Sequence, residues 1–182
     1  MSWIKTIGKG LGGIFLLMVL FLASLYRQDI SPDEVNLKYL SPESQFIEVG
    51  GIRVHVRIMG EGEPIFLLHG SFASLHTWEP WQQELSPYYQ TISLDFPGHG
   101  LTGPDSLKRY GVKDYSELVH ALAQKLNIEQ YHVAGNSMGG AVAMQLASDY
   151  PGNVRSLNLI DAAGAPAADR TLSDSTAPKK SN

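Results

Sequence analysis

Hydrophobic and polar positions alternate along this chain in patterns that predict strands and helices in turn. Apolar residues occupy every second position from Ile52 to Ile58, and the preceding Gly50-Gly51 pair is typical of a tight hairpin turn. Further strands are predicted at four apolar runs, at 64–70, 89–95, 129–137 and 154–161. Such continuous apolar runs are typical of strands that are buried on both faces of a parallel sheet.

Helical spacing of apolar residues separates these strands. It is found at 74–85, at 112–127 and at 139–151, where Pro151 closes the last helix. Trp78 and Trp81 are predicted to be packing residues. Strands that alternate with helices predict an α/β fold, with a mostly parallel sheet and helices on both faces.

The first 45 residues follow a different pattern. The run from Gly10 to Tyr26 carries no charge and follows Lys5 and Lys9, which predicts a signal anchor or transmembrane segment over residues 1–27. This reading implies a single-pass membrane protein whose globular part lies on the non-cytoplasmic side. The alternative is a cleaved signal peptide and secretion, for which Ala23 and Ser24 are the only small residues near a cleavage point. Residues 28–45 are polar and predict a linker.

Composition narrows the possible chemistry. The chain has 182 residues, of which 43% are hydrophobic, which is enough for one domain with a real core. It contains no cysteine, which excludes disulfides, thiolate catalysis and cysteine-based metal sites. The formal net charge of −4 gives no reason to expect nucleic acid as a partner. No metal or organic cofactor is implied.

The strongest chemical signal is the sequence Gly135-Asn136-Ser137-Met138-Gly139, which fits G-x-S-x-G between a predicted strand and a predicted helix. The turn in this motif is so tight that the residues flanking the serine must be small. Ser137 is therefore predicted to be a catalytic nucleophile, exposed at the carboxyl end of its strand. The N–H of Met138, at the helix N-terminus, is predicted to face the oxyanion of a tetrahedral intermediate.

A second oxyanion donor is expected from the loop after the strand at 64–70. The N–H of Ser71 is the preferred candidate and that of Phe72 the alternative. His99 invites a role as general base, but its place between glycines in a tight turn favours a structural role. A structural role is also predicted for His55.

The segments "HGSF" (69–72), "DFPGHG" (95–100) and "GNSMGG" (135–140), in this order, resemble the α/β-hydrolase superfamily, specifically its esterase, lipase-like and carbon–carbon bond hydrolase branch. The resemblance covers residues 46–161. It implies that Ser137 is the nucleophile, that Met138 and Ser71 are the oxyanion donors, and that the substrate is a small carboxylic ester or similar acyl compound. Dehalogenases and epoxide hydrolases of the family carry aspartate in place of Ser137, which disfavours those reactions.

The chain departs from the family in one respect. The family order is Ser, then Asp or Glu, then His, whereas all six histidines of this chain precede Ser137. Asp161 is the one candidate acid after it. Residues 162–182 have lost all periodicity and predict a disordered tail where the family's lid is expected to start. The first expectation is a membrane-anchored serine hydrolase, and the alternatives are an inactive truncated hydrolase, a carbon–carbon bond hydrolase and a binding module.

Overall fold

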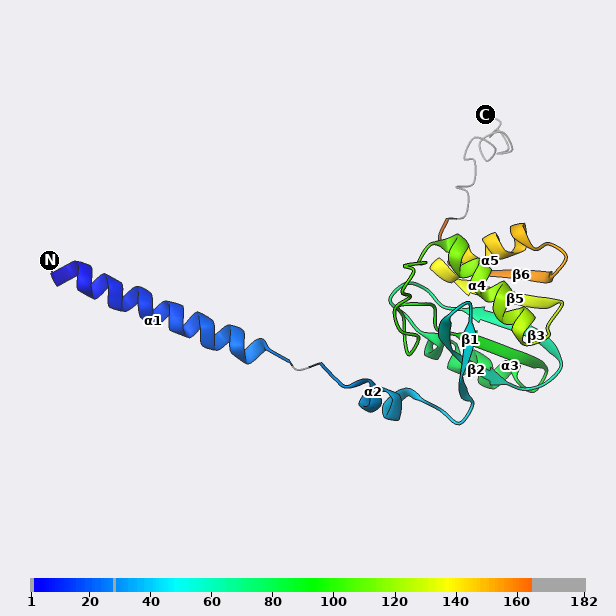
Figure 1. Ribbon diagram of the computed structural model, residues 1–182, viewed down its shortest axis with the longest axis horizontal. Coiled ribbons are helices and arrows are strands. Elements are labelled where there is room, and N and C mark those ends of the chain that lie inside the picture. The colour runs from blue at the N-terminus through cyan, green and yellow to red at the C-terminus, as the bar shows by residue number, and fades with distance from the viewer. Residues whose placement is uncertain (1, 28, 165–182) are drawn as a thin grey trace, which may run out of the picture. The chain divides into compact units, whose positions relative to one another are not determined.

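The computed structural model describes residues 2–27 and 29–164, which belong to two compact units, Met1–Tyr39 and Leu40–Asn182 (Figure 1). The first unit contains helix α1 (Ser2–Leu25) and helix α2 (Pro32–Tyr39). The predicted disordered tail lies outside the described residues from residue 165 onward.

Helix α1 covers the segment predicted to be a membrane anchor. Its described side chains, from Gly12 onward, are all exposed, and most of them are apolar. Within residues 2–27 and 29–164, however, no helix is at once long enough and apolar enough to cross a bilayer. The transmembrane helix predicted for residues 1–27 is therefore not shown.

The predicted linker at 28–45 contains a short helix, α2, which the sequence analysis missed. Pro32 begins it, and Ser31 caps it, because the Ser31 hydroxyl accepts a hydrogen bond from the N–H of Glu34 at 3.2 Å. Serine before proline is a favourable start for a helix, since the proline lacks the N–H that would have no partner there. This local signal outweighs the polar composition of the segment.

The second unit is built on a six-stranded sheet with the order β1-β2-β4-β3-β5-β6. Its strands are β1 (Ser44–Val49), β2 (Ile52–Met59), β3 (Glu63–Leu68), β4 (Tyr89–Leu94), β5 (Tyr131–Asn136) and β6 (Val154–Ile160). The pairs from β4 to β6 are parallel, whereas β1 pairs antiparallel with β2, and β2 with β4. The mostly parallel sheet is as predicted.

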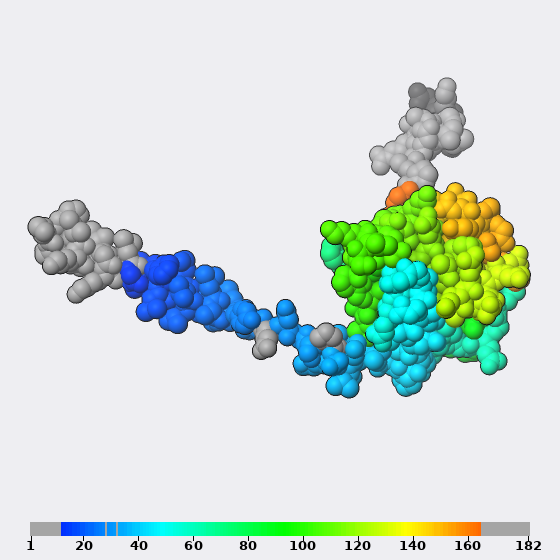
Figure 2. Space-filling model, in the orientation of Figure 1, coloured from blue at the N-terminus to red at the C-terminus, as the bar shows by residue number. Residues whose placement is uncertain are grey.

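The hairpin between β1 and β2 turns at Gly50 and Gly51. Their φ angles are 56° and 80°, and a two-residue turn with two positive φ angles matches the right-handed twist of the strands. Arg109, from the loop before α4, donates a hydrogen bond to the Gly50 carbonyl at 3.1 Å. The hairpin and this loop therefore lie side by side on the surface, as the cyan and green atoms of Figure 2 show.

Helices cover both faces of the sheet, as alternate residues of β3 demonstrate. Phe66 and Leu68 pack with residues of α4 (Val112–Lys125) and α5 (Met138–Asp149), whereas Ile65 and Leu67 pack with Trp78. Successive side chains of a strand point to opposite faces. The α4 and α5 helices therefore lie on one face, and the 3₁₀ turn η1 (Leu75–Trp78) with α3 (Glu79–Leu85) lies on the other.

Among the described residues, strand β6 has a hydrogen-bonded neighbour, β5, on one side only. Leu157 and Leu159 are 38% and 43% exposed, and they border a hollow of about 620 Å³ that also contacts Trp81, which is half exposed. An edge strand presents unpaired N–H and C=O groups, and apolar side chains beside it favour association with other chains. This edge is the main structural reason to expect aggregation of the second unit.

We expect the double substitution Leu157→Lys, Leu159→Lys to reduce both aggregation and the fluorescence of a dye that binds exposed apolar surface. Both side chains are already partly exposed, so the lysine stems can lie along the surface with the ammonium groups in water. Leu107→Lys is the matched control, because Leu107 is 70% exposed in a loop away from β6. Equal dye binding by the double variant and the wild type would contradict the prediction.

Candidate active site

Ser137 sits at the junction between β5 and α5, alone between the last residue of the strand and the first residue of the helix. Its backbone has φ 50° and ψ −115°, a combination that non-glycine residues rarely adopt. Strand, serine and helix thus follow one another as the motif predicts. The strained turn holds the half-buried serine out at the carboxyl end of the parallel strands.

Glycines make this turn possible because there is no room for side chains around it. A Cβ atom on Gly135 would lie 2.2 Å from the Gly139 carbonyl oxygen, and one on Gly139 would lie 2.1 Å from the Leu68 carbonyl oxygen. Gly140 is equally confined, because its Cβ would lie 2.4 Å from the Cβ of Ala162. The prediction that the residues flanking Ser137 must be small agrees with this packing.

Four backbone hydrogen bonds fix the position of Ser137. Its N–H donates to the Ile160 carbonyl at 3.2 Å, which ties the elbow to the end of β6. Its carbonyl accepts from the N–H groups of Gly140, Ala141 and Ala163 at 3.0, 3.2 and 2.9 Å. The strained backbone of Ser137 is therefore held by the first turn of α5 and by the segment at and after the end of β6.

The two predicted oxyanion donors come from segments that lie next to each other. Met138 is the first residue of α5, where a backbone N–H has no acceptor within the helix. Ser71 follows Gly70, and a Cβ on Gly70 would lie 3.2 Å from the Cβ of Ser137. The loop that carries Ser71 thus lies against the elbow, while Ser71 itself and Phe72 are exposed.

His69 holds this loop in place and is fully buried. Its Nδ1 donates to the Gly70 carbonyl at 2.7 Å, and its Nε2 accepts from the N–H of Phe96 at 3.1 Å. Burial lowers the pKa of His69, which keeps the ring neutral and leaves Nε2 as an acceptor. His69 is therefore a clamp between two loops.

Asp95 is the second buried anchor of this region. Its carboxylate accepts hydrogen bonds from the N–H groups of Leu75 and Leu101 at 2.7 and 2.8 Å, and from Nδ1 of His55 at 2.8 Å. Burial raises the pKa of Asp95, but the bonds from His55, Leu75 and Leu101 outweigh this, so its pKa is lowered. The ionised carboxylate fixes two loops to strand β2.

The remaining histidines have partners other than the Ser137 hydroxyl. His99 is half-buried, and its Nδ1 lies 3.3 Å from the Pro97 carbonyl oxygen, which agrees with the structural role favoured for it. His76 pairs with Glu79, His120 stacks on Tyr150, and His132 contacts Ser156 and Glu63. Within the described part of the chain, no side-chain hydrogen bond joins a histidine to Ser137.

Asp161, the candidate acid, directly follows β6. It is exposed and has a φ angle of 45°, so the chain turns sharply at this residue. No histidine among the described residues is hydrogen-bonded to it. The structure therefore places Ser137 and brings the Ser71 loop next to it, but residues 2–27 and 29–164 assemble no triad around Ser137.

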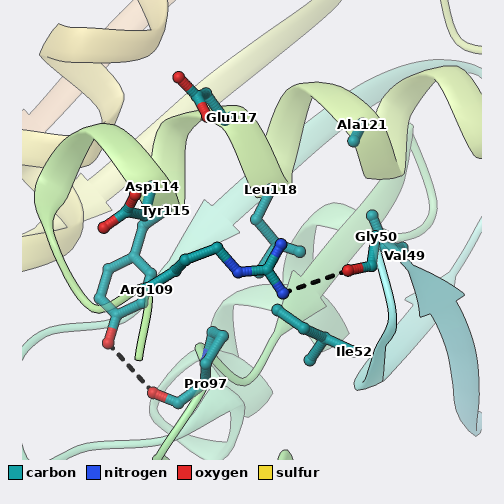
Figure 3. A pocket seen from close by; sticks show the side chains of 10 residues that line it. All are labelled: Val49, Gly50, Ile52, Pro97, Arg109, Asp114, Tyr115, Glu117, Leu118 and Ala121. Carbon is teal, nitrogen blue, oxygen red and sulfur yellow. Dashed lines mark hydrogen bonds between the residues drawn. The ribbon is translucent and has the colours of Figure 1, made fainter. Parts of the chain in front are cut away.

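A hollow of about 160 Å³ lies elsewhere, between α4 and the β1–β2 hairpin, and Figure 3 shows its lining. Arg109 crosses it, held by Asp105, and this ion pair lowers the pKa of the Asp105 carboxyl far below its usual range. Tyr115 donates to the Pro97 carbonyl at 3.0 Å. These contacts hold the loop between β4 and α4, and the hollow includes no part of the Ser137 turn.

Comparison with known proteins agrees with the architecture. The sequence model of the alpha/beta hydrolase fold family matches residues 63–178. Among curated proteins, the chain is 40% identical over 125 residues to a dihydrolipoyllysine-residue acetyltransferase component of an acetoin cleaving system from Pseudomonas putida, covering 68% of this chain and 34% of that protein. It is 31% identical over 123 residues to a 2-hydroxy-6-oxo-2,4-heptadienoate hydrolase of the same species, covering 66% and 45%. The chain thus spans between a third and a half of these two relatives.

Solved structures of similar fold include two hydrolases. A meta-cleavage product hydrolase is 29% identical with a TM-score of 0.59, covering 62% of this chain and 43% of that one. A membrane phospholipase A described as a bacterial virulence factor is 27% identical with a TM-score of 0.68, covering 92% and 58%.

We expect Gly139→Ala to destabilise the second unit by about 1–3 kcal/mol, the usual cost of forcing an extra methyl group into a packed site. The reason is the 2.1 Å approach of its Cβ to the Leu68 carbonyl oxygen, which backbone atoms cannot relieve cheaply. Urea unfolding followed by circular dichroism measures the change. Gly152→Ala is the control, since its Cβ would meet nothing within 4 Å. Similar unfolding midpoints for the two variants would contradict the close packing described for the elbow.

Proposed function

The chain belongs to the alpha/beta hydrolase fold family, and on this premise we propose that it is the nucleophile-bearing part of a serine hydrolase that acts on carboxylic esters or similar acyl compounds. The observation that carries the proposal is the strained Ser137 turn between β5 and α5, with φ 50°. Strain of this kind persists only where neighbouring structure enforces it, and it is common at catalytic sites.

In the proposed reaction, the Ser137 hydroxyl attacks the carbonyl carbon of the ester. The N–H groups of Met138 and Ser71 donate hydrogen bonds to the oxyanion, and the alcohol departs to leave an acyl-enzyme that water then hydrolyses. The position of Met138 at the helix N-terminus supports its role, because the helix dipole favours negative charge there. The packing of Gly70 against Ser137 supports the role of Ser71, which follows it directly.

This chemistry also needs a general base, which in the family is a histidine that follows the serine in the sequence. Every histidine precedes Ser137 in the sequence. His55 and His69 have both ring nitrogens engaged in hydrogen bonds, so neither offers a free acceptor to Ser137. We therefore propose that the 182 residues alone hold the nucleophile in its reactive conformation but hydrolyse esters slowly.

The second candidate reaction is hydrolysis of a carbon–carbon bond, favoured by the likeness to two hydrolases named for such substrates, the 2-hydroxy-6-oxo-2,4-heptadienoate hydrolase and the meta-cleavage product hydrolase. The likeness to the membrane phospholipase A favours ester hydrolysis. The match to the phospholipase covers 92% of this chain. Residues 40–182 alone make up less than four-fifths of the chain, so the match must include part of the N-terminal unit. We therefore rank an ester substrate first.

The same likeness, together with the exposed apolar side chains of α1, supports a second proposal, that this helix attaches the protein to a membrane. Ten large apolar side chains of α1 are between 43% and 67% exposed: Ile14, Phe15, Leu16, Leu17, Met18, Val19, Leu20, Phe21, Leu22 and Leu25. Soluble surfaces rarely expose so large a continuous apolar patch. The globular unit is proposed to lie on the non-cytoplasmic side, since Lys5 and Lys9 precede the apolar run.

We expect the full chain to hydrolyse a short p-nitrophenyl ester weakly, because general-base help typically contributes roughly 10²–10⁴-fold to such a reaction. Release of p-nitrophenolate is compared between the wild type and Ser137→Ala. Turnover typical of serine esterases that disappears in the Ala variant would show that a histidine of this chain acts as the base. A parallel assay with a meta-cleavage product as substrate tests the second candidate reaction.

We expect the full chain to remain with membranes after washing with alkaline carbonate, because burial of each large apolar side chain in lipid contributes about 1.5–3 kcal/mol. Fractionation and immunoblotting measure the distribution. A variant with Leu17→Glu and Leu20→Glu on α1 is expected to move to the soluble fraction. Release of the intact wild type by the wash would contradict the proposed attachment.

A further inference from the structure

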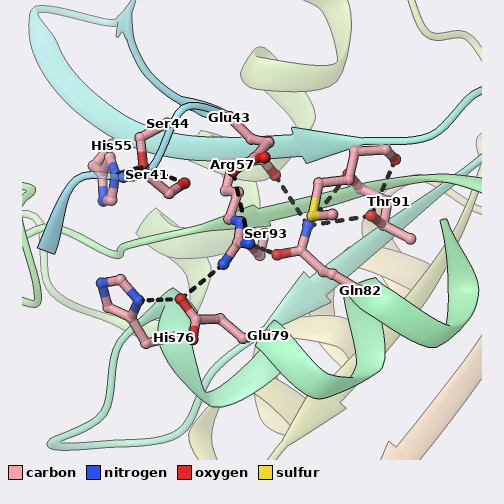
Figure 4. Close-up of polar contacts among 11 residues, drawn as sticks. Ser41, Glu43, Ser44, His55, Arg57, His76, Glu79, Gln82, Thr91 and Ser93 are labelled. Atoms are coloured by element: carbon pink, nitrogen blue, oxygen red, sulfur yellow. Dashed lines mark hydrogen bonds and ion pairs between the residues drawn. The ribbon is translucent and has the colours of Figure 1, made fainter.

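Ser44, His55 and Asp95 form a second chain of serine, histidine and aspartate, apart from Ser137. The Ser44 Oγ lies 3.0 Å from His55 Nε2, and His55 Nδ1 lies 2.8 Å from Asp95 Oδ2. Figure 4 shows Ser44 and His55 joined in this way at the start of β1. A serine–histidine–aspartate relay is recognised by these distances and roles and not by sequence position.

The hydrogen bonds determine where the protons lie. The Asp95 carboxylate is ionised, because three donors, His55 and the N–H groups of Leu75 and Leu101, hold it in that state. A carboxylate only accepts, so His55 Nδ1 carries a proton and donates it to Asp95. With no proton on Nε2, this nitrogen can accept the proton of the Ser44 hydroxyl, 3.0 Å away. This is the arrangement in which an imidazole can withdraw the proton of a serine. The Ser41 hydroxyl, 3.3 Å from the Ser44 Oγ, is another hydrogen-bond neighbour of that oxygen.

The surroundings of the relay leave its serine end nearest to solvent. His55 and Asp95 are fully buried, whereas Ser44 is half-buried on β1, the other edge strand of the sheet. Ser44 stands diagonally across from His55, because the residue that pairs directly with His55 is Phe46. The backbone N–H of Ser41 donates to the Ser44 Oγ at 3.1 Å, which fixes the oxygen in place.

The positive charge near Ser44, on Arg57, is balanced by nearby glutamates, which limits how well an oxyanion could be stabilised there. Arg57 pairs directly across from Ser44 in the sheet, but its guanidinium bonds to Glu79 at 2.7 Å and lies 3.8 Å from Glu43. Little net positive charge is left to stabilise an oxyanion. The relay is therefore suited to acyl groups that carry a good leaving group, and to one transfer more than to repeated turnover.

We propose that Ser44 is a nucleophilic hydroxyl that accepts an acyl group from activated esters, independently of Ser137. The Ser44 Oγ attacks the carbonyl carbon while His55 Nε2 takes its proton. The bond to the leaving oxygen breaks, and the proton passes from His55 to that leaving group or to water. The products are an acyl ester on Ser44 and a free alcohol or phenol, with no redox change.

Acetylation by p-nitrophenyl acetate, mapped by mass spectrometry, tests the proposal in the full chain. Trypsin cleavage after Lys38 and Arg53 places Ser44 in the peptide 39–53, and cleavage after Lys125 and Arg155 places Ser137 in the peptide 126–155. We expect Ser44 to acetylate about 100-fold faster in the folded chain than in concentrated urea, the lower end of general-base help. The same digest reports on Ser137 separately, so failure at one serine leaves the result at the other readable.

His55→Gln is expected to reduce acetylation of Ser44 to the rate in urea, while Ser137→Ala leaves it unchanged. Ser106→Ala is the matched control, because Ser106 is an exposed hydroxyl in the loop before α4, outside the relay. Should His55→Gln fail to fold, the comparison of folded and unfolded wild type decides the matter alone. The proposal is overturned by a Ser44 that is not acetylated, or that reacts no faster folded than in urea.

Discussion

The close approach of the β5–α5 turn to the end of β3 is the constraint on which the rest of this structure depends. A side chain at Gly139 would overlap the carbonyl of Leu68, so the helix can meet the sheet here only if that position is glycine. The same approach brings Gly70 against Ser137 and thereby sets the Ser71 loop beside the serine. Removing it would separate Ser137, the proposed nucleophile, from the loop proposed to hold the oxyanion.

Two buried polar side chains, His69 and Asp95, hold the loops beside the Ser137 turn in place through hydrogen bonds. His69 links Gly70 to Phe96, and Asp95 links Leu75 and Leu101 to His55. Hydrogen bonds to a buried carboxylate are stronger than neutral ones, and deleting one partner of a buried charged group typically costs about 3–5 kcal/mol. The loops beside the site are thus held by charge and hydrogen bonding, while apolar packing holds the sheet beneath them.

Among the described residues, the proposed nucleophile Ser137 is held in place but has no hydrogen-bonded base. A catalytic triad usually meets two requirements at one serine: a strained backbone that exposes the hydroxyl, and a base that removes its proton. Here the two are found at different serines. In this chain the glycine-lined turn meets the first requirement at Ser137. A histidine in the orientation that the second requires is found instead at His55, where it faces Ser44. Under the two proposals, strained presentation of a serine and removal of a serine proton therefore depend on different residues.

The sequence by itself determined the element order, the hairpin at Gly50-Gly51, the parallel strands and the elbow around Ser137. All of these follow from local periodicity or from steric limits that a few neighbouring residues set. It missed helix α2, where a serine–proline start outweighed polar composition. Only the tertiary structure decided which groups meet across long separations: His55 and Asp95 are 40 positions apart, and Gly70 and Ser137 are farther apart still. Spacing along the chain carries no signal for such pairs, because they are brought together by strand order and register.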